Sequence, residues 1–152
     1  EMLKLATYCL DRPIDVEDVR ALVSDARKAN VFAMVDALGQ RQPETALKEL
    51  RKLISDGDHP LRVMAMVIRQ FRMLIQVKEL TEAGTSPEEI GRQVGISYRT
   101  AQGVQRQSRN FSFRQLEKAY RQLQECDLQI KLGAREPEAA LELLVLELLR
   151  AA

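Results

Sequence analysis

Residues 60–84 read PLRVMAMVIRQFRMLIQVKELTEAG, and this stretch decides the fold class. Its apolar side chains recur at helical spacing between a proline and a glycine, with Arg69-Gln70-Phe71-Arg72 near the middle. Proline suits the first turn of a helix because its missing N–H would have no partner there, and glycine commonly ends a helix. The stretch therefore predicts one long helix.

The rest of the 152-residue chain continues this helical pattern, and strand signals are missing because β-branched clusters are short. Ser86, Ser97 and Ser112 are suitable caps for three further helices. Ser86-Pro87-Glu88-Glu89 has the pattern of a capping box with proline in the first turn. The sequence predicts an all-α helical bundle of nine helices, over residues 2–10, 15–23, 30–39, 43–57, 60–84, 86–95, 97 onward, 112–133 and 137–150.

One polar stretch, residues 24–30, is a candidate domain boundary, since it separates a two-helix piece from a larger helical body. Asn30 at its end is expected to cap the helix that follows. No internal repeat or low-complexity linker is evident in the sequence. We therefore expect a short unit over residues 1–28 and a larger helical unit over residues 29–152.

The charge of the chain is balanced but uneven. Its net charge is +1, so the chain as a whole is not an electrostatic binder of nucleic acid. Between residues 90 and 121, however, seven basic residues accompany a single acidic one, Glu117. This basic run is interpreted as a solvated face with weak, sequence-independent affinity for DNA.

Few residues are suited to catalysis or metal binding. His59, the single histidine, precedes a proline and is expected in an exposed loop. Cys9 and Cys126 have no second ligand at metal-binding spacing and are expected to be buried free thiols. No glycine-rich phosphate loop occurs. The sequence therefore predicts no catalytic residue, no cofactor and no metal ion.

The sequence also carries no membrane or export signal. No apolar run reaches the roughly 18 residues of a membrane span. Residues 1–10 lack the basic start of a signal peptide. The expected location is the cytoplasm, without membrane contact. Because the helical pattern is already under way at residue 1, the sequence suggests an expressed fragment of a longer chain.

Residues 88–107 resemble a DNA-binding helix-turn-helix. One helix is followed by the turn Gly95-Ile96-Ser97 and by a second helix with polar residues near its start. In DNA readers this second helix lies in the major groove, where Arg pairs with guanine and Gln with adenine. Arg99, Thr100 and Gln102 are therefore candidate DNA contacts of a helix-turn-helix regulator. A structural corner is the alternative, since any tight turn between two helices needs such residues.

The last predicted helix, residues 136–150, is apolar around most of its circumference. Such a helix is buried nearly all round. At the end of a chain this size, its own domain covers only part of that surface, and large exposed apolar patches are rare on monomers. A central helix enclosed by its own bundle is the alternative. The candidate interface residues are Leu141, Leu144, Leu148 and Leu149.

Several short motifs occur in the order and spacing of a known family. They are Pro13-Ile14, Glu17-Asp18-Val19 with Leu22-Val23, Val31-Phe32, Val35-Asp36-Ala37-Leu38, Arg69-Gln70-Phe71-Arg72, Gly95-Ile96, Phe111-Ser112 with Leu116, and Asp127 with Lys131. Over nearly its whole length the chain resembles the C-terminal part of the delta subunit of the bacterial DNA polymerase III clamp loader.

This resemblance implies a role in assembly. Residues 1–28 correspond to the end of an AAA+ lid domain, and residues 29–152 to the collar domain that joins clamp-loader subunits in a ring. Delta-type subunits are not ATPases, so the resemblance implies no enzyme activity for this fragment. The expected partners are the other loader subunits. The sliding clamp would be contacted only through an N-terminal AAA+ module that the fragment lacks, and contact with DNA would be weak or indirect.

Overall fold

The computed structural model describes residues 15–151, and helices account for most of them. Their bounds are α2 Val16–Gly39, α3 Pro43–Ser55, α4 Pro60–Glu82, α5 Pro87–Val94, α6 Tyr98–Ser108, α7 Phe113–Lys131 and α8 Pro137–Ala151. No strand occurs between residues 15 and 151. The predicted all-α class is thus confirmed. The helix predicted over residues 2–10 lies outside the described residues.

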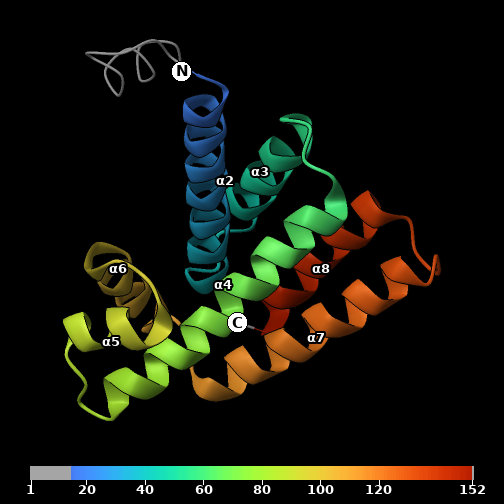
Figure 1. Cartoon of the computed structure of the whole chain (residues 1–152). Coiled ribbons are helices and arrows are strands. Elements are labelled where there is room, and N and C mark those ends of the chain that lie inside the picture. The colour runs from blue at the N-terminus through green and yellow to red at the C-terminus, as the bar shows by residue number, and fades with distance from the viewer. Residues whose placement is uncertain (1–14, 152) are drawn as a thin grey trace.

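The long helix α4 is the centre of the bundle and contacts all six other described helices. Figure 1 shows α4 crossing the middle of the molecule, with α5 and α6 at its C-terminal end and α7 and α8 along the other side. Helices α2 and α3 pack against each other and lie above α4 in the same view. The core contains fully buried side chains from α2, α3, α4, α7 and α8, among them Leu38, Leu50, Phe71, Leu123 and Leu141.

Local chemistry fixes most helix ends as expected. Ser97 and Ser112 cap α6 and α7, and Gln115 completes a capping box with Ser112. Gly95 ends α5 in the left-handed conformation, with φ of 74°, which glycine adopts without steric cost. His59 is exposed as predicted, and its Nδ1 also caps α4 by accepting a hydrogen bond from the backbone N–H of Leu61 at 3.3 Å.

The capping box predicted at the start of α5 is half formed. The Ser86 hydroxyl accepts from the backbone N–H of Glu89 at 3.3 Å, as expected. The Glu89 carboxylate, however, lies 2.7 Å from Arg92 and accepts from the Gln93 side chain at 3.0 Å. Arg92 and Gln93 lie one turn further along the helix. The Glu89 carboxylate binds them and not the backbone N–H of Ser86, which a complete capping box requires.

The break predicted at residues 24–30 is wrong, because α2 is continuous from Val16 to Gly39. This stretch contains good helix formers, so its polarity marks a partly exposed surface and not an interruption. Asn30 does not cap a helix, and its side chain accepts a hydrogen bond from Lys52 of α3 at 3.1 Å. Arg27 pairs with Asp58, before α4, at 2.9 Å.

Gly39 provides the space that lets α2 meet the core. A Cβ atom at this position would lie 2.7 Å from the ring of Phe111. That ring packs edge-on against Phe71 of α4, with centroids 5.9 Å apart and an interplanar angle of 66°. Gly39 is therefore required by close packing, in addition to ending the helix as predicted.

Candidate functional site

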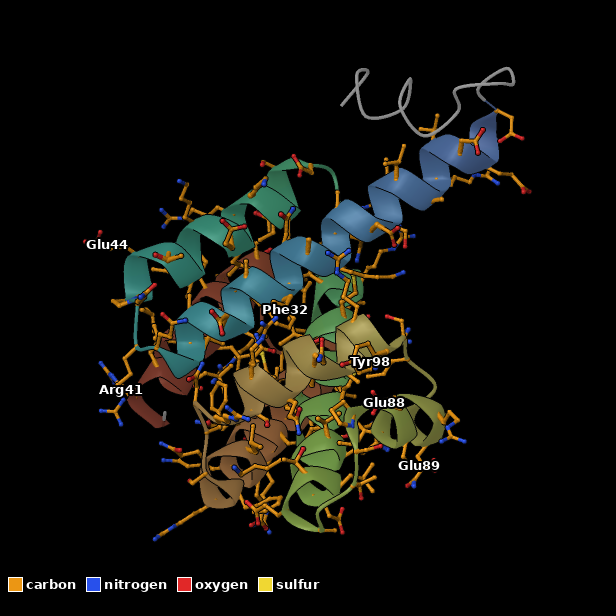
Figure 2. All side chains as sticks on the ribbon, turned by 90° about the vertical axis from the view of Figure 1, so that its left-hand side faces the viewer. Phe32, Arg41, Glu44, Glu88, Glu89 and Tyr98 are labelled. Carbon is orange, nitrogen blue, oxygen red and sulfur yellow. The ribbon has the colours of Figure 1, made fainter. Side chains whose placement is uncertain are left out.

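A groove of about 1190 Å³ opens between α2, α4 and the corner that joins α5 to α6. Figure 2 shows this face of the molecule, with Phe32 between α2 and α6, and Tyr98 at the start of α6. The residues that define its chemistry are Phe32, Met66, Arg69, Met73, Arg99 and Arg106. Five arginines in all line the groove, together with an aromatic ring and two thioethers.

The corner between α5 and α6 is closely packed. The backbone N–H of Ile96 donates to the Gly91 carbonyl at 2.9 Å, which closes the turn after α5. A Cβ atom at Gly91 would lie 2.9 Å from the Ile96 carbonyl oxygen, so only glycine fits there without a shift. This packing holds the first turn of α6, with Arg99 and Thr100, at the edge of the groove.

A buried chain of hydrogen bonds joins the three walls of the groove. Gln70 of α4 donates from Nε2 to Oε1 of Gln107 of α6 at 2.7 Å. Gln107 in turn donates from Nε2 to the carbonyl oxygen of Phe32 in α2 at 2.9 Å. Both glutamines are buried, so these bonds satisfy groups that would otherwise be costly to remove from water. They fix the relative positions of α2, α4 and α6.

The four residues Arg69-Gln70-Phe71-Arg72 therefore have four different surroundings. Gln70 joins the buried chain just described, and Phe71 lies fully in the core. The guanidinium of Arg72 donates to the hydroxyl of Tyr120 in α7, at 3.2 Å from Nη2. Arg69 is exposed and lines the groove. The sequence motif thus binds α4 to two neighbouring helices and leaves the guanidinium of Arg69 facing the groove.

The cations of the groove differ in whether they have an acidic partner. Arg27 lies 2.9 Å from the fully buried carboxylate of Asp58, and Arg62 lies 3.9 Å from the same group. Lys28 pairs with Asp25, the only acidic residue among those lining the groove, at 3.2 Å. By contrast, three guanidiniums form no ion pair within residues 15–151; they belong to Arg69, Arg99 and Arg106.

The structure separates the three residues predicted to contact DNA. Arg99 and Thr100 are exposed and line the groove. Gln102 is half-buried, and its side chain donates to the hydroxyl of Tyr98 at 2.6 Å. Because α2 forms the opposite wall, Arg99 faces a groove within its own chain. A DNA-reading helix instead enters the major groove with its early polar residues against base edges.

The predicted interface leucines of α8 lie mostly inside the bundle. Leu141, Leu144 and Leu148 are buried, and Leu149 is half-buried against the core. The leucines of α8 that face solvent are Leu143 and Leu146, which are 44% and 42% exposed. At 100° per residue these two lie on the side opposite the buried positions. The sequence pattern alone could not give this orientation, because leucines occur on all sides of the helix.

Cys126 is buried as predicted, and burial raises the pKa of its thiol. Its Sγ donates to the carbonyl oxygen of Ala140, 3.8 Å away in α8. Cys9 lies outside the described residues.

Among residues 15–151, no group of three or more His, Cys, Asp or Glu side chains could hold a metal ion. None of the described helices is long and apolar enough to cross a membrane.

These features define an all-helical domain with exposed leucines on α8 and a cationic groove. The family described as "DNA polymerase III delta subunit, C-terminal domain" matches residues 28–148. The chain belongs to this family.

Individual relatives agree with this assignment. The chain is 28% identical over 151 residues to the DNA polymerase III subunit delta of Bacillus subtilis, covering 99% of this chain and 44% of that protein. It is 36% identical over 98 residues to the probable delta subunit of Aquifex aeolicus, covering 63% of this chain and 28% of that protein. A solved structure of the Bacillus subtilis DNA clamp loader delta protein matches with a TM-score of 0.81 and 28% identity, over 98% of this chain and 44% of that one. The chain thus spans less than half the length of these relatives.

Proposed function

We propose that this chain is the collar module of a clamp-loader delta subunit and that it holds other loader subunits in place during sliding-clamp loading. Family membership supports the delta-subunit part of this proposal. The role is one of assembly within the DNA polymerase III holoenzyme in the bacterial cytoplasm. The module is not an enzyme. The sliding clamp is contacted through an AAA+ module outside these 152 residues, and DNA only weakly or indirectly.

The observation that carries the proposal is an exposed apolar surface on α7 and α8. Leu143 and Leu146 project from α8, and Leu128 and Leu132 are 56% and 73% exposed at the C-terminal end of α7. Four exposed leucines on adjacent helices are costly to leave in water and suit a protein interface. We place the contact with a neighbouring subunit there, and Leu149 is the one member of the predicted set that keeps exposed surface.

The proposed division of the chain keeps its original boundary, with the end of a lid domain over 1–28 and the collar over 29–152. The first half of α2 supports this division. Val16, Val19 and Val23 are 65%, 40% and 39% exposed and recur at helical spacing, so they form an apolar stripe without cover among the described residues. The family match begins at residue 28. A lid domain packed on the stripe would cover it, and α2 would then join the two domains as a continuous helix.

Co-purification with the other clamp-loader subunits tests the collar proposal. We expect Leu143→Glu combined with Leu146→Glu to abolish association while helical circular dichroism stays normal, because a charge in an apolar interface is costly to desolvate. Tyr98→Glu is a matched control of similar exposure on α6, where Tyr98 is 47% exposed, and it should assemble normally. If the double variant is folded and still assembles, α8 is not the contact and the collar proposal loses its main support.

A further inference from the structure

The groove between α2, α4 and α6 has a cationic rim over an apolar floor. The rim carries the guanidiniums of Arg69, Arg99 and Arg106, which have no acidic partner within residues 15–151. All three side chains belong to exposed residues. Charges of one sign gathered without compensation repel one another and attract an anion. The rim therefore favours a ligand that carries several negative charges.

The floor favours a ligand with apolar side chains as well. Phe32, Met66, Met73 and Ile96 line the groove and are each only half-buried. Methionine adapts its shape to an incoming apolar group, which makes it common at surfaces that bind peptides. A nucleic acid would instead favour exposed aromatic rings for base stacking. The nearby exposed ring, Tyr98, is not part of the groove lining.

The walls of the groove are held in place before any ligand arrives. The hydrogen bonds from Gln70 to Gln107 and from Gln107 to Phe32 tie the three helices together. Gly103 of α6 lies against the ring of Phe32, where an added Cβ would be 3.7 Å away. Little backbone entropy of these three helices is then lost on binding, which favours affinity.

A second cavity of about 390 Å³ extends this surface along α4. It shares Arg69, Met73 and Ile96 with the groove. Asp127 and Lys131 of α7 line its far side as an ion pair at 2.5 Å. The groove with this extension exceeds the roughly 300–1,000 Å³ of small-molecule sites. Its size suits a segment of a polypeptide.

We infer that this groove binds an acidic amphipathic segment of a partner protein, with carboxylates on Arg69, Arg99 and Arg106 and apolar side chains on the methionines below. Such a segment presents anchors at i, i+3, i+4 and i+7 on one face. The groove is lined by α2, α4 and the corner between α5 and α6, whereas the proposed collar contact lies on α7 and α8. The inference therefore goes beyond the assembly role, and either proposal can fail while the other holds.

Fluorescence anisotropy with a labelled synthetic peptide tests this inference. The probe is an amphipathic peptide of about 15 residues, roughly 22 Å long as a helix, with Glu on one face and Leu and Met on the other. A second peptide has Gln in place of every Glu. We expect the acidic peptide to bind at least about tenfold more tightly than its neutral counterpart, since the attraction depends on its charges.

Variants of the protein locate the site. Arg99→Glu with Arg106→Glu should weaken binding of the acidic peptide at least about tenfold. Arg109→Glu is the matched control, because Arg109 is exposed at the end of the same helix but lies outside the groove. That variant should bind within about twofold of the original protein. Met66→Gln should also weaken binding, which tests the apolar floor separately.

Three outcomes would overturn the inference. The first is equal affinity for the acidic and neutral peptides. The second is an equal loss in the Arg109→Glu variant, which would mean that only overall charge matters. The third is displacement of the peptide by an unlabelled single-stranded oligonucleotide that binds more tightly, which would identify the groove as a nucleic-acid site. The Leu143→Glu variant should keep peptide binding, so the groove and the collar contact are tested independently.

Discussion

Gln70 and Gln107 form a hydrogen bond of 2.7 Å inside the protein, although they lie 37 positions apart in the sequence. Gln107 is also bonded to the carbonyl of Phe32, so one side chain joins α6 to both α4 and α2. Inside a protein, a polar group that loses its partner costs more than a hydrogen bond contributes on average. This pair therefore favours one arrangement of the three helices over other ways of packing the same apolar surfaces.

We predict that Gln70→Leu destabilises the fold by about 1–3 kcal/mol, because it leaves the Gln107 oxygen buried without this donor. Urea unfolding followed by circular dichroism measures the change. Gln102→Leu is the control: its side chain bonds only to the Tyr98 hydroxyl near the surface, and its effect should stay within about 0.5 kcal/mol. A loss at Gln70 no larger than the loss at Gln102 would show that the buried pair contributes little.

Two glycines of the structure should respond to alanine in opposite directions. At Gly39 the new Cβ would meet the Phe111 ring at 2.7 Å, so Gly39→Ala should destabilise by about 1–3 kcal/mol through overpacking. At Gly103 the nearest atom is 3.7 Å away, on Phe32. Gly103→Ala within α6 should therefore stabilise by roughly 0.5–1 kcal/mol, because alanine suits a helix interior better. Thermal unfolding of both variants compares them, and a shift of the same sign in both would contradict the packing argument.

The helix ends were predictable because they depend on a few neighbouring residues. Ser112 and Gly95 act as expected, since capping and left-handed turns need one particular side chain at one position. The break at residues 24–30 was wrongly predicted because polarity marks exposure as well as loops. Only the folded chain reveals that Arg27 lies against Asp58.

The groove was less predictable than the helices. The sequence pointed to Arg99 and Thr100 through a short local pattern, and both line the groove. Arg69 and Phe32 come from distant parts of the chain, so no local signal relates them to α6. The buried face of α8 could not be predicted for another reason. Its leucines occur on every side of the helix, so helical periodicity does not identify one buried face. Leu143 and Leu146 could be assigned to the surface only from the packed structure.

Glutamate substitutions along α8 should separate buried from exposed positions. Leu148→Glu places a carboxylate in the core and should unfold the protein, because an unpaired buried charge costs several kcal/mol. The same result is expected at Leu141 and Leu144. Leu143→Glu and Leu146→Glu should keep normal helical circular dichroism. If Leu148→Glu remains folded with an unchanged urea midpoint, α8 does not pack against the core through Leu148.

The start of α8 depends on an ionised side chain. Glu136 accepts hydrogen bonds from the backbone N–H groups of Ala139 at 2.7 Å and Glu138 at 3.1 Å. These two bonds lower the pKa of the Glu136 carboxyl below its ordinary value. They stabilise the charged form at a helix N-terminus, where backbone N–H groups have no partner within the helix.

A lowered pKa in the folded state makes this contribution depend on pH in one direction. The stabilisation by Glu136 is fully present above the pKa of the unfolded chain, roughly 4.3 for Glu, and is lost as pH falls through the lower folded value. We predict that Glu136→Gln lowers the urea midpoint at neutral pH and that the difference from the original protein shrinks toward about pH 3. Glu138→Gln is the control for charge alone, since it removes a first-turn carboxylate of the same helix. If both variants lose the same stability at neutral pH, the effect comes from the helix dipole, and the two backbone hydrogen bonds of Glu136 contribute nothing of their own.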